Sequence, residues 1–192
     1  MYEYIQGKLV EATPAYAVVD CGGVGFHLHI SVNTYSGIAQ QSEIRLWVHQ
    51  IVREDAHLLY GFATKEERSL FKQLISVSGI GANTASVMLS SMTADEITTA
   101  ILTGNVNAIK SVKGIGLKTA QRVIIELKDK VGASGSAETF VFSAGTFKEE
   151  ALSALVMLGF AKAQASKVLD KITAEGKVST VEELIKLALK QL

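Results

Sequence analysis

An internal duplication with a spacing of 35 residues constrains the fold of this 192-residue chain more than any other feature of its sequence. Residues 76–85 (SVSGIGANTA) align with residues 111–120 (SVKGIGLKTA), and seven of the ten positions are identical. The identical positions include two glycines, the isoleucine between them and the Thr-Ala pair that follows. Such a repeat indicates two copies of one supersecondary unit.

Each copy predicts a helix, a tight Gly-Ile-Gly turn and a second helix. Glycine adopts positive φ without strain and, because it has no Cβ, lets a ligand approach the backbone. We expect Ile80 and Ile115 to point inward and hold their turns. The helix after each turn begins with unpaired amides and the positive end of its dipole, which together favour phosphate. The repeat therefore predicts a tandem helix-hairpin-helix unit that grips a nucleic-acid backbone without reading bases.

A single copy is equally consistent with an ordinary αα-hairpin whose glycines only form a tight joint. The charge distribution helps to decide between this interpretation and backbone binding. The net charge of the whole chain is zero, but residues 65–132 carry nine basic and six acidic groups. Two matched copies in this basic segment favour backbone binding. Lys113, Lys118 and Arg122 add positive charge beside the second turn, whereas the first has Asn83 in the place of Lys118.

The N-terminal third of the chain, residues 1–63, predicts a small β-barrel. Stretches rich in valine, isoleucine and aromatic residues predict five short strands, at residues 2–12, 16–21, 26–30, 44–49 and 58–62. Closure into a barrel would leave no strand edge exposed.

The apolar period changes at Thr64, where helices are expected to begin. Thr-x-x-Glu capping boxes start at Thr64, Thr93 and Thr180. The predicted organisation is therefore α+β and multidomain: a barrel, about five helices over residues 64–131, a flexible linker over residues 132–147 and three helices over residues 148–192. The linker prediction rests on a run of small, polar and nearly uncharged residues.

The remaining residues do not indicate catalysis or a metal site. The single cysteine, Cys21, excludes an internal disulfide and is expected in the barrel core. His27 and His29 are expected on one sheet face, without acidic or cysteine partners at ligand spacing. The chain has no P-loop, so we expect no ATP hydrolysis by the chain itself. It has neither a secretory signal nor an apolar run of about 18 residues, which predicts a cytoplasmic protein outside the membrane.

The order of barrel, tandem helix-hairpin-helix unit, linker and helical tail resembles the RuvA family of Holliday-junction-binding proteins over essentially the whole chain. The most specific matches are residues 4–9 (YIQGKL), 52–62 (VREDAHLLYGF) and 114–120 (GIGLKTA). The resemblance implies an OB-fold barrel and a homotetramer, used singly or in pairs, that holds a four-way DNA junction open and square-planar. It implies two protein partners, the hexameric ATPase RuvB and the resolvase RuvC, in recombination and DNA repair. It also implies a non-catalytic subunit without a cofactor, because RuvB uses the ATP.

The resemblance also implies the residues of three sites. DNA contacts fall on Gly79, Gly81, Thr84, Gly114, Gly116, Lys118, Thr119 and Arg122. An acidic pin at the centre of the tetramer falls on Glu54 and Asp55. Apolar anchors for RuvB fall on Leu155, Leu158 and Phe160. The family usually has lysine where this chain has Asn83, which departs from the pattern in the first hairpin.

Two other interpretations remain open at this stage. DNA glycosylases and some nucleases also use helix-hairpin-helix units, but a glycosylase needs a nucleophilic lysine or an activating aspartate in a base-flipping pocket. Asp129 lies only ten residues past Thr119, on the same predicted helix. A ubiquitin-associated-type peptide-binding domain would explain residues 148–192 and nothing else.

Overall fold

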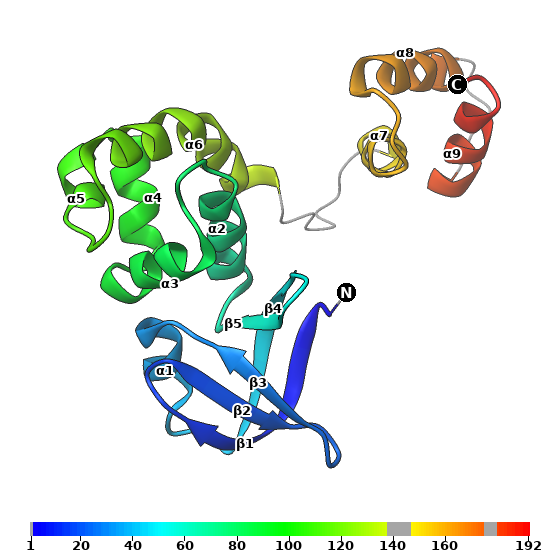
Figure 1. The fold of residues 1–192 in the computed structure, drawn as a ribbon. Helices are drawn as coiled ribbons and strands as arrows, with labels where there is room; N and C mark the ends of the chain where they lie inside the picture. The colour runs from blue at the N-terminus through cyan, green and yellow to red at the C-terminus, as the bar shows by residue number, and fades with distance from the viewer. Residues whose placement is uncertain (1, 138–146, 175–179) are drawn as a thin grey trace. The chain divides into compact units, whose positions relative to one another are not determined.

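Residues 2–137, 147–174 and 180–192 are described in the computed structural model, and they belong to two units, Met1–Glu138 and Thr139–Leu192 (Figure 1). The first unit contains the barrel and the duplicated hairpins. The second contains the helical tail.

The five predicted strands form a closed barrel with the order β1-β2-β3-β5-β4. The strands are β1 (Tyr4–Ala12), β2 (Tyr16–Asp20), β3 (Gly25–His29), β4 (Glu43–Val52) and β5 (His57–Phe62). All neighbours pair antiparallel except β3 and β5, which pair in parallel. Side chains alternate along each strand, so that Ile44, Leu46 and Val48 of β4 enter the core. The OB-like barrel is confirmed.

One glycine of the barrel is required by close packing. A Cβ at Gly7 would lie 2.1 Å from the carbonyl oxygen of Asp20, on the neighbouring strand β2. Any other residue would therefore force β1 and β2 apart at this point.

A short helix, α1 (Val32–Ile38), lies between β3 and β4 and was not predicted. Ser31 caps it, its hydroxyl oxygen accepting a hydrogen bond from the amide of Thr34 over 3.0 Å. The sequence VNTYSGI has low helix propensity and spans only seven residues, so no amphipathic period is visible in it.

Five helices complete the first unit, as predicted. They are α2 (Lys65–Ile75), α3 (Ala82–Ser91), α4 (Ala94–Leu102), α5 (Val106–Lys110) and α6 (Leu117–Ala137). Thr93 and Glu96 form the full capping box expected at α4. At α2 the expected box is only half right: Thr64 caps the amide of Glu67, but the Glu67 carboxylate turns to Ala63 N and α1 instead.

The helix α6 extends further than the sequence predicts. It continues to Ala137, through residues 132–137 that were assigned to the linker. Alanine favours helix, and adding a residue to an existing helix is easier than starting one, so a small-residue segment can prolong α6 despite its glycine. Of the rest of the predicted linker, residues 138–146 lie outside the described residues, and Phe147 is the first residue of the next helix instead of the last residue of the linker.

Three helices form the second unit, as predicted: α7 (Phe147–Met157), α8 (Lys162–Ala174) and α9 (Val181–Leu189). They share a small core of buried side chains, which consists of Ala151, Leu155, Ala165, Leu169, Ile172, Leu184 and Ala188. Thr180 caps α9, its hydroxyl oxygen accepting from the amide of Glu183. Within the described part of the chain, no helix is long and apolar enough to cross a membrane.

Candidate nucleic-acid interface

The two hairpins repeat one another in backbone detail. Each turn is closed by the isoleucine amide: Ile80 N donates to Val77 O over 3.0 Å, and Ile115 N donates to Val112 O over 3.1 Å. Two further pairs of hydrogen bonds recur with the 35-residue spacing. In the first pair, Ser76 Oγ donates to Gln73 O and Ser111 Oγ donates to Ala108 O, both over 2.7 Å. In the second pair, Ala85 N donates to Gly81 O and Ala120 N donates to Gly116 O, both over 2.9 Å. The sequence duplication is thus a structural duplication.

The two glycines of each turn have different tasks. Gly79 and Gly114 adopt φ values of 96° and 91°, a region that other residues enter only with strain. Gly81 and Gly116 do not have positive φ, and a Cβ at either position would meet no atom within 4 Å. The first glycine therefore makes the turn, and the second leaves the surface open for another backbone.

Both turn isoleucines point inward, as predicted. Ile80 is 4% exposed and Ile115 is 5% exposed, and both belong to the core shared by the five helices. Because their side chains are buried, they fix the turns and leave the glycines at the surface.

The groups expected to meet phosphate gather where α3 and α6 begin. Gly81 precedes α3 and offers no side-chain cap, so the first amides of that helix have no such acceptor. Lys118 is exposed in the first turn of α6, while Thr84 and Thr119 are half-buried in the first turns of α3 and α6. Amides, hydroxyls and one ammonium group thus lie at the two helix starts.

Arg122 ties the two hairpins together. Its Nη1 donates to the carbonyl oxygen of Ser78 over 3.3 Å, and its Nε lies 3.7 Å from Glu126 Oε1. A Cβ at Gly79 would lie 3.8 Å from the side chain of Thr119, so the two turns are neighbours. About half of the Arg122 side chain is exposed, which leaves part of the guanidinium for an anion.

Asn83 faces the barrel as well as the surface. The hydroxyl of Tyr60, on β5, donates to Asn83 Oδ1 over 3.4 Å. The residue at the position of Lys118 in the first hairpin therefore brings no charge and has a partner within its own chain.

The predicted acidic pin lies at the tip of the β4–β5 hairpin. Glu54 and Asp55 are exposed there, and the tip is closed by Arg53 N donating to Ala56 O over 2.8 Å. The preceding Val52 is 62% exposed. The two carboxylates are thus presented to the outside of the single chain.

The predicted motor-binding anchors separate into core and surface. Leu155 is fully buried among the three helices, so its assignment as a partner-facing side chain is corrected to a core position. Leu158 is 61% exposed, and Phe160 is half-buried against the core. Met157, which the sequence analysis did not single out, is 74% exposed beside Leu158. In a small three-helix unit, the spacing of apolar residues along the sequence does not show which of two apolar positions three residues apart faces the core.

The other titratable candidates lie in the barrel and on α6. His27 and His29 lie on one sheet face with ring centroids 5.3 Å apart, and burial together with the charge of His27 lowers the pKa of His29. Cys21 is half-buried beside the barrel core, and Asp129 is exposed on α6. Across the described residues, no group of three or more metal-ligating side chains comes together.

The residues that attach the hairpins to the barrel escaped the sequence analysis. Glu67 and Arg68, in the first turn of α2, contact the start of α1, strand β4 and Glu3, the residue directly before β1. In the sequence, only Glu67 drew attention among these residues, and its pattern predicts a helix cap with Thr64 and not an attachment to the barrel.

Comparison with protein families matches three successive parts of the chain. Residues 1–61 match the RuvA N terminal domain, residues 71–129 match the SAM-like helix-hairpin-helix tandem, and residues 147–192 match the RuvA C-terminal domain.

Curated relatives match over the full length. The chain is 51% identical to a protein of Christiangramia forsetii, 51% to one of Bacteroides thetaiotaomicron and 46% to one of Porphyromonas gingivalis. Each alignment covers 100% of both chains, and each of these relatives is named "Holliday junction branch migration complex subunit RuvA".

Proposed function

The chain belongs to the RuvA family, and from this membership we propose that it binds four-way DNA junctions as the DNA-binding subunit of a branch-migration complex. The observation that supports this most directly is the pair of matched hairpins, because each has an open glycine at the surface directly before a helix start.

The hairpins bind the phosphate backbone of the junction arms. The amides after Gly81 and Gly116 donate to phosphate oxygens, Thr84 and Thr119 add hydroxyls, and Lys118 adds a charge. None of these groups needs a base edge, so binding is independent of sequence and falls steeply with salt.

Four copies of the chain assemble around the junction, singly or as two facing tetramers. Glu54 and Asp55 of the four barrels then gather near the centre, where strands exchange. Eight carboxylates at this point repel phosphates and keep the strands apart, while the hairpins hold the arms.

The second unit recruits the motor. Leu158 and Met157 offer an exposed apolar surface for the ATPase RuvB, and buried Leu155 keeps the helix beneath them in place. The motor hydrolyses ATP, the resolvase RuvC joins the larger complex, and the present chain holds the DNA without a cofactor. The protein works in the cytoplasm, where bacterial DNA lies.

A native gel shift tests this function. The full-length protein is titrated against a four-way junction, a duplex of the same arm sequence and a single strand. Tighter binding to the junction than to both linear forms is the expected result, and equal binding to junction and duplex contradicts the proposal. Incubation with damaged duplex is the second arm, in which strand cleavage or base release would indicate a processing enzyme of the glycosylase or nuclease class.

A further inference from the structure

Two neighbouring residues hold the start of α2 to the barrel from two sides. Glu67 is 7% exposed, yet its carboxylate is fully engaged: Oε1 accepts from Ser31 Oγ over 2.7 Å, and Oε2 accepts from Thr34 Oγ1 over 2.8 Å and from Ala63 N over 3.2 Å. Ser31 and Thr34 are themselves buried at the start of α1. Loss of a donor to a buried carboxylate costs free energy, so the three hydrogen bonds favour a single arrangement of α2 against α1.

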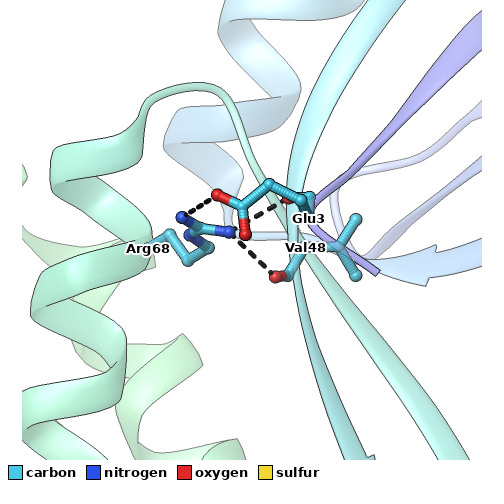
Figure 2. A network of polar contacts seen from close by, with 3 residues as sticks. All are labelled: Glu3, Val48 and Arg68. Atoms are coloured by element: carbon cyan, nitrogen blue, oxygen red, sulfur yellow. Dashed lines mark hydrogen bonds and ion pairs between the residues drawn. The ribbon is translucent and has the colours of Figure 1, made fainter. Parts of the chain in front are cut away.

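Arg68 makes the second attachment, which Figure 2 shows reaching from α2 to the barrel. Its Nη2 lies 2.6 Å from Glu3 Oε1, and its Nη1 donates to Glu3 O over 3.0 Å and to Val48 O over 3.4 Å. The hydrogen bond from Arg68 lowers the pKa of Glu3 below its ordinary value. The guanidinium of Arg68 thus joins α2 to β4 and to Glu3, the residue directly before β1. We call Glu67, Arg68 and these partners the α2 clamp.

The helix α1 holds the other helix of the first hairpin as well. Asn33 Nδ2 donates to Leu89 O over 2.6 Å and to Met92 O over 3.1 Å, at the end of α3, and Val32 N donates to Ser90 Oγ over 3.1 Å. Both helices that flank the first turn are therefore fixed to the same short helix of the barrel.

Small movements at the clamp would be amplified at the turn. From Arg68 to Ser76 the helix rises about 12 Å, so a tilt of about 10° would shift the turn by about 2 Å. Sites that depend on several hydrogen bonds must be held to about 0.5 Å. The barrel carries carboxylates at Glu54 and Asp55 that repel phosphate, and the hairpins carry groups that attract it. The distance between the acidic tip and the hairpins therefore decides which DNA shape can reach the hairpins and still avoid the carboxylates.

We propose that Glu67 is a positioning residue that fixes the hairpins on the barrel and thereby sets the preference for a four-way junction over duplex. This role rests on the proposed function, because it presumes that hairpins and acidic tip meet the same DNA. Glu67 itself touches no DNA, since its carboxylate is buried in the α1–α2 contact.

The test compares Glu67→Gln with two matched controls in the full-length chain. An amide accepts at one oxygen only, so Glu67→Gln loses part of the three-donor contact. Glu66→Gln makes the same charge change at an exposed neighbour in the same helical turn. Ile97→Val lowers stability through the hydrophobic core of the hairpins, without touching the clamp.

Two readouts are taken for each variant. Junction and duplex affinities give the selectivity ratio. Spin labels on Val24→Cys, in the β2–β3 turn, and Leu102→Cys, at the end of α4, give the barrel-to-hairpin distance in a Cys21→Ser background. Labelled chains are diluted with unlabelled ones so that distances within one subunit dominate.

We expect Glu67→Gln to broaden the distance distribution and to lower the junction-to-duplex ratio about tenfold, within the range of couplings through shared networks. Both controls should leave both readouts unchanged, although Ile97→Val lowers the melting temperature. If Glu67→Gln does not fold, Thr34→Val removes one donor and takes its place.

Three results would overturn the role of Glu67: an unchanged distance distribution, a broadened distribution with unchanged selectivity, or an equal loss of selectivity in Ile97→Val. A parent protein without junction preference would instead overturn the proposed function. The label distance needs no DNA, so in that case it still decides whether Glu67 fixes the joint.

Discussion

Replacing Lys118 with alanine should flatten the salt dependence of junction binding. Lys118 is exposed at the start of α6, and we expect one phosphate contact from it in each subunit. Each such contact contributes about 0.9 to the slope of log K against log salt. Between about 50 and 200 mM salt, the parent protein should therefore lose about 3.5-fold more affinity per subunit than the variant, or about 150-fold for four subunits.

The assay is a fluorescence-anisotropy titration of a labelled junction at five salt concentrations. Lys118→Arg keeps the charge and should restore the slope. Lys171→Ala removes an exposed lysine from α8, in the second unit, and should leave the slope unchanged. Arg122→Ala should change the slope less than Lys118→Ala, because its guanidinium already donates to Ser78 O and lies near Glu126.

An unchanged slope in Lys118→Ala would refute the phosphate contact. A defect confined to some arm sequences would refute it as well, because a phosphate contact weakens binding to every sequence alike. A loss of affinity without a change in slope would mean that the lysine acts on the fold of the hairpin and not on the DNA.

Three further predictions concern the open glycine, the acidic tip and the tail. Gly81→Ala should weaken junction binding at least tenfold, which is on the order of one lost hydrogen bond to a charged group. The melting temperature should change little, because a Cβ at this position meets only open space in the free protein. Neutralising the tip with Glu54→Gln and Asp55→Asn should tighten duplex binding more than junction binding in a gel shift, since both carboxylates repel phosphate; an unchanged ratio would count against the pin. Leu155→Ala should destabilise the second unit by about 2–5 kcal/mol in thermal unfolding, whereas Leu158→Ala should leave the helical circular dichroism intact and weaken capture of the ATPase.

Local patterns predicted the elements because those elements are specified locally. Alternating side chains define the strands of the barrel, and Thr93 with Glu96 marks a helix start within four residues. The hairpins could be predicted because a ten-residue segment recurs with seven identical residues. Each copy keeps the glycine, Gly79 or Gly114, whose positive φ the turn requires. These signals require no knowledge of distant contacts.

Residues whose role depends on tertiary packing could not be assigned from the sequence. Leu155 and Leu158 lie three positions apart on one helical pattern, yet one is buried and the other is mostly exposed. Two of the three partners of the Glu67 carboxylate, Ser31 and Thr34, lie at the start of α1, more than thirty residues earlier in the chain. The Thr-x-x-Glu motif predicts that the Glu67 carboxylate accepts from the amide of Thr64, but the packing of α1 against α2 brings the hydroxyls of Ser31 and Thr34 to that carboxylate instead.

The two hairpins share a backbone but not their charges, and this difference suggests a division of labour. A shift of 35 residues places Asn83 at the position of Lys118 and Val87 at the position of Arg122, so the first hairpin lacks both cations. The same hairpin is the one held by the α2 clamp, by Asn33 and by Arg122 through Ser78. A site that binds phosphate mainly through backbone amides gains little from long-range attraction and depends on exact placement. The second hairpin can draw the DNA in with Lys118, whereas the first can contribute only if its turn is already in position.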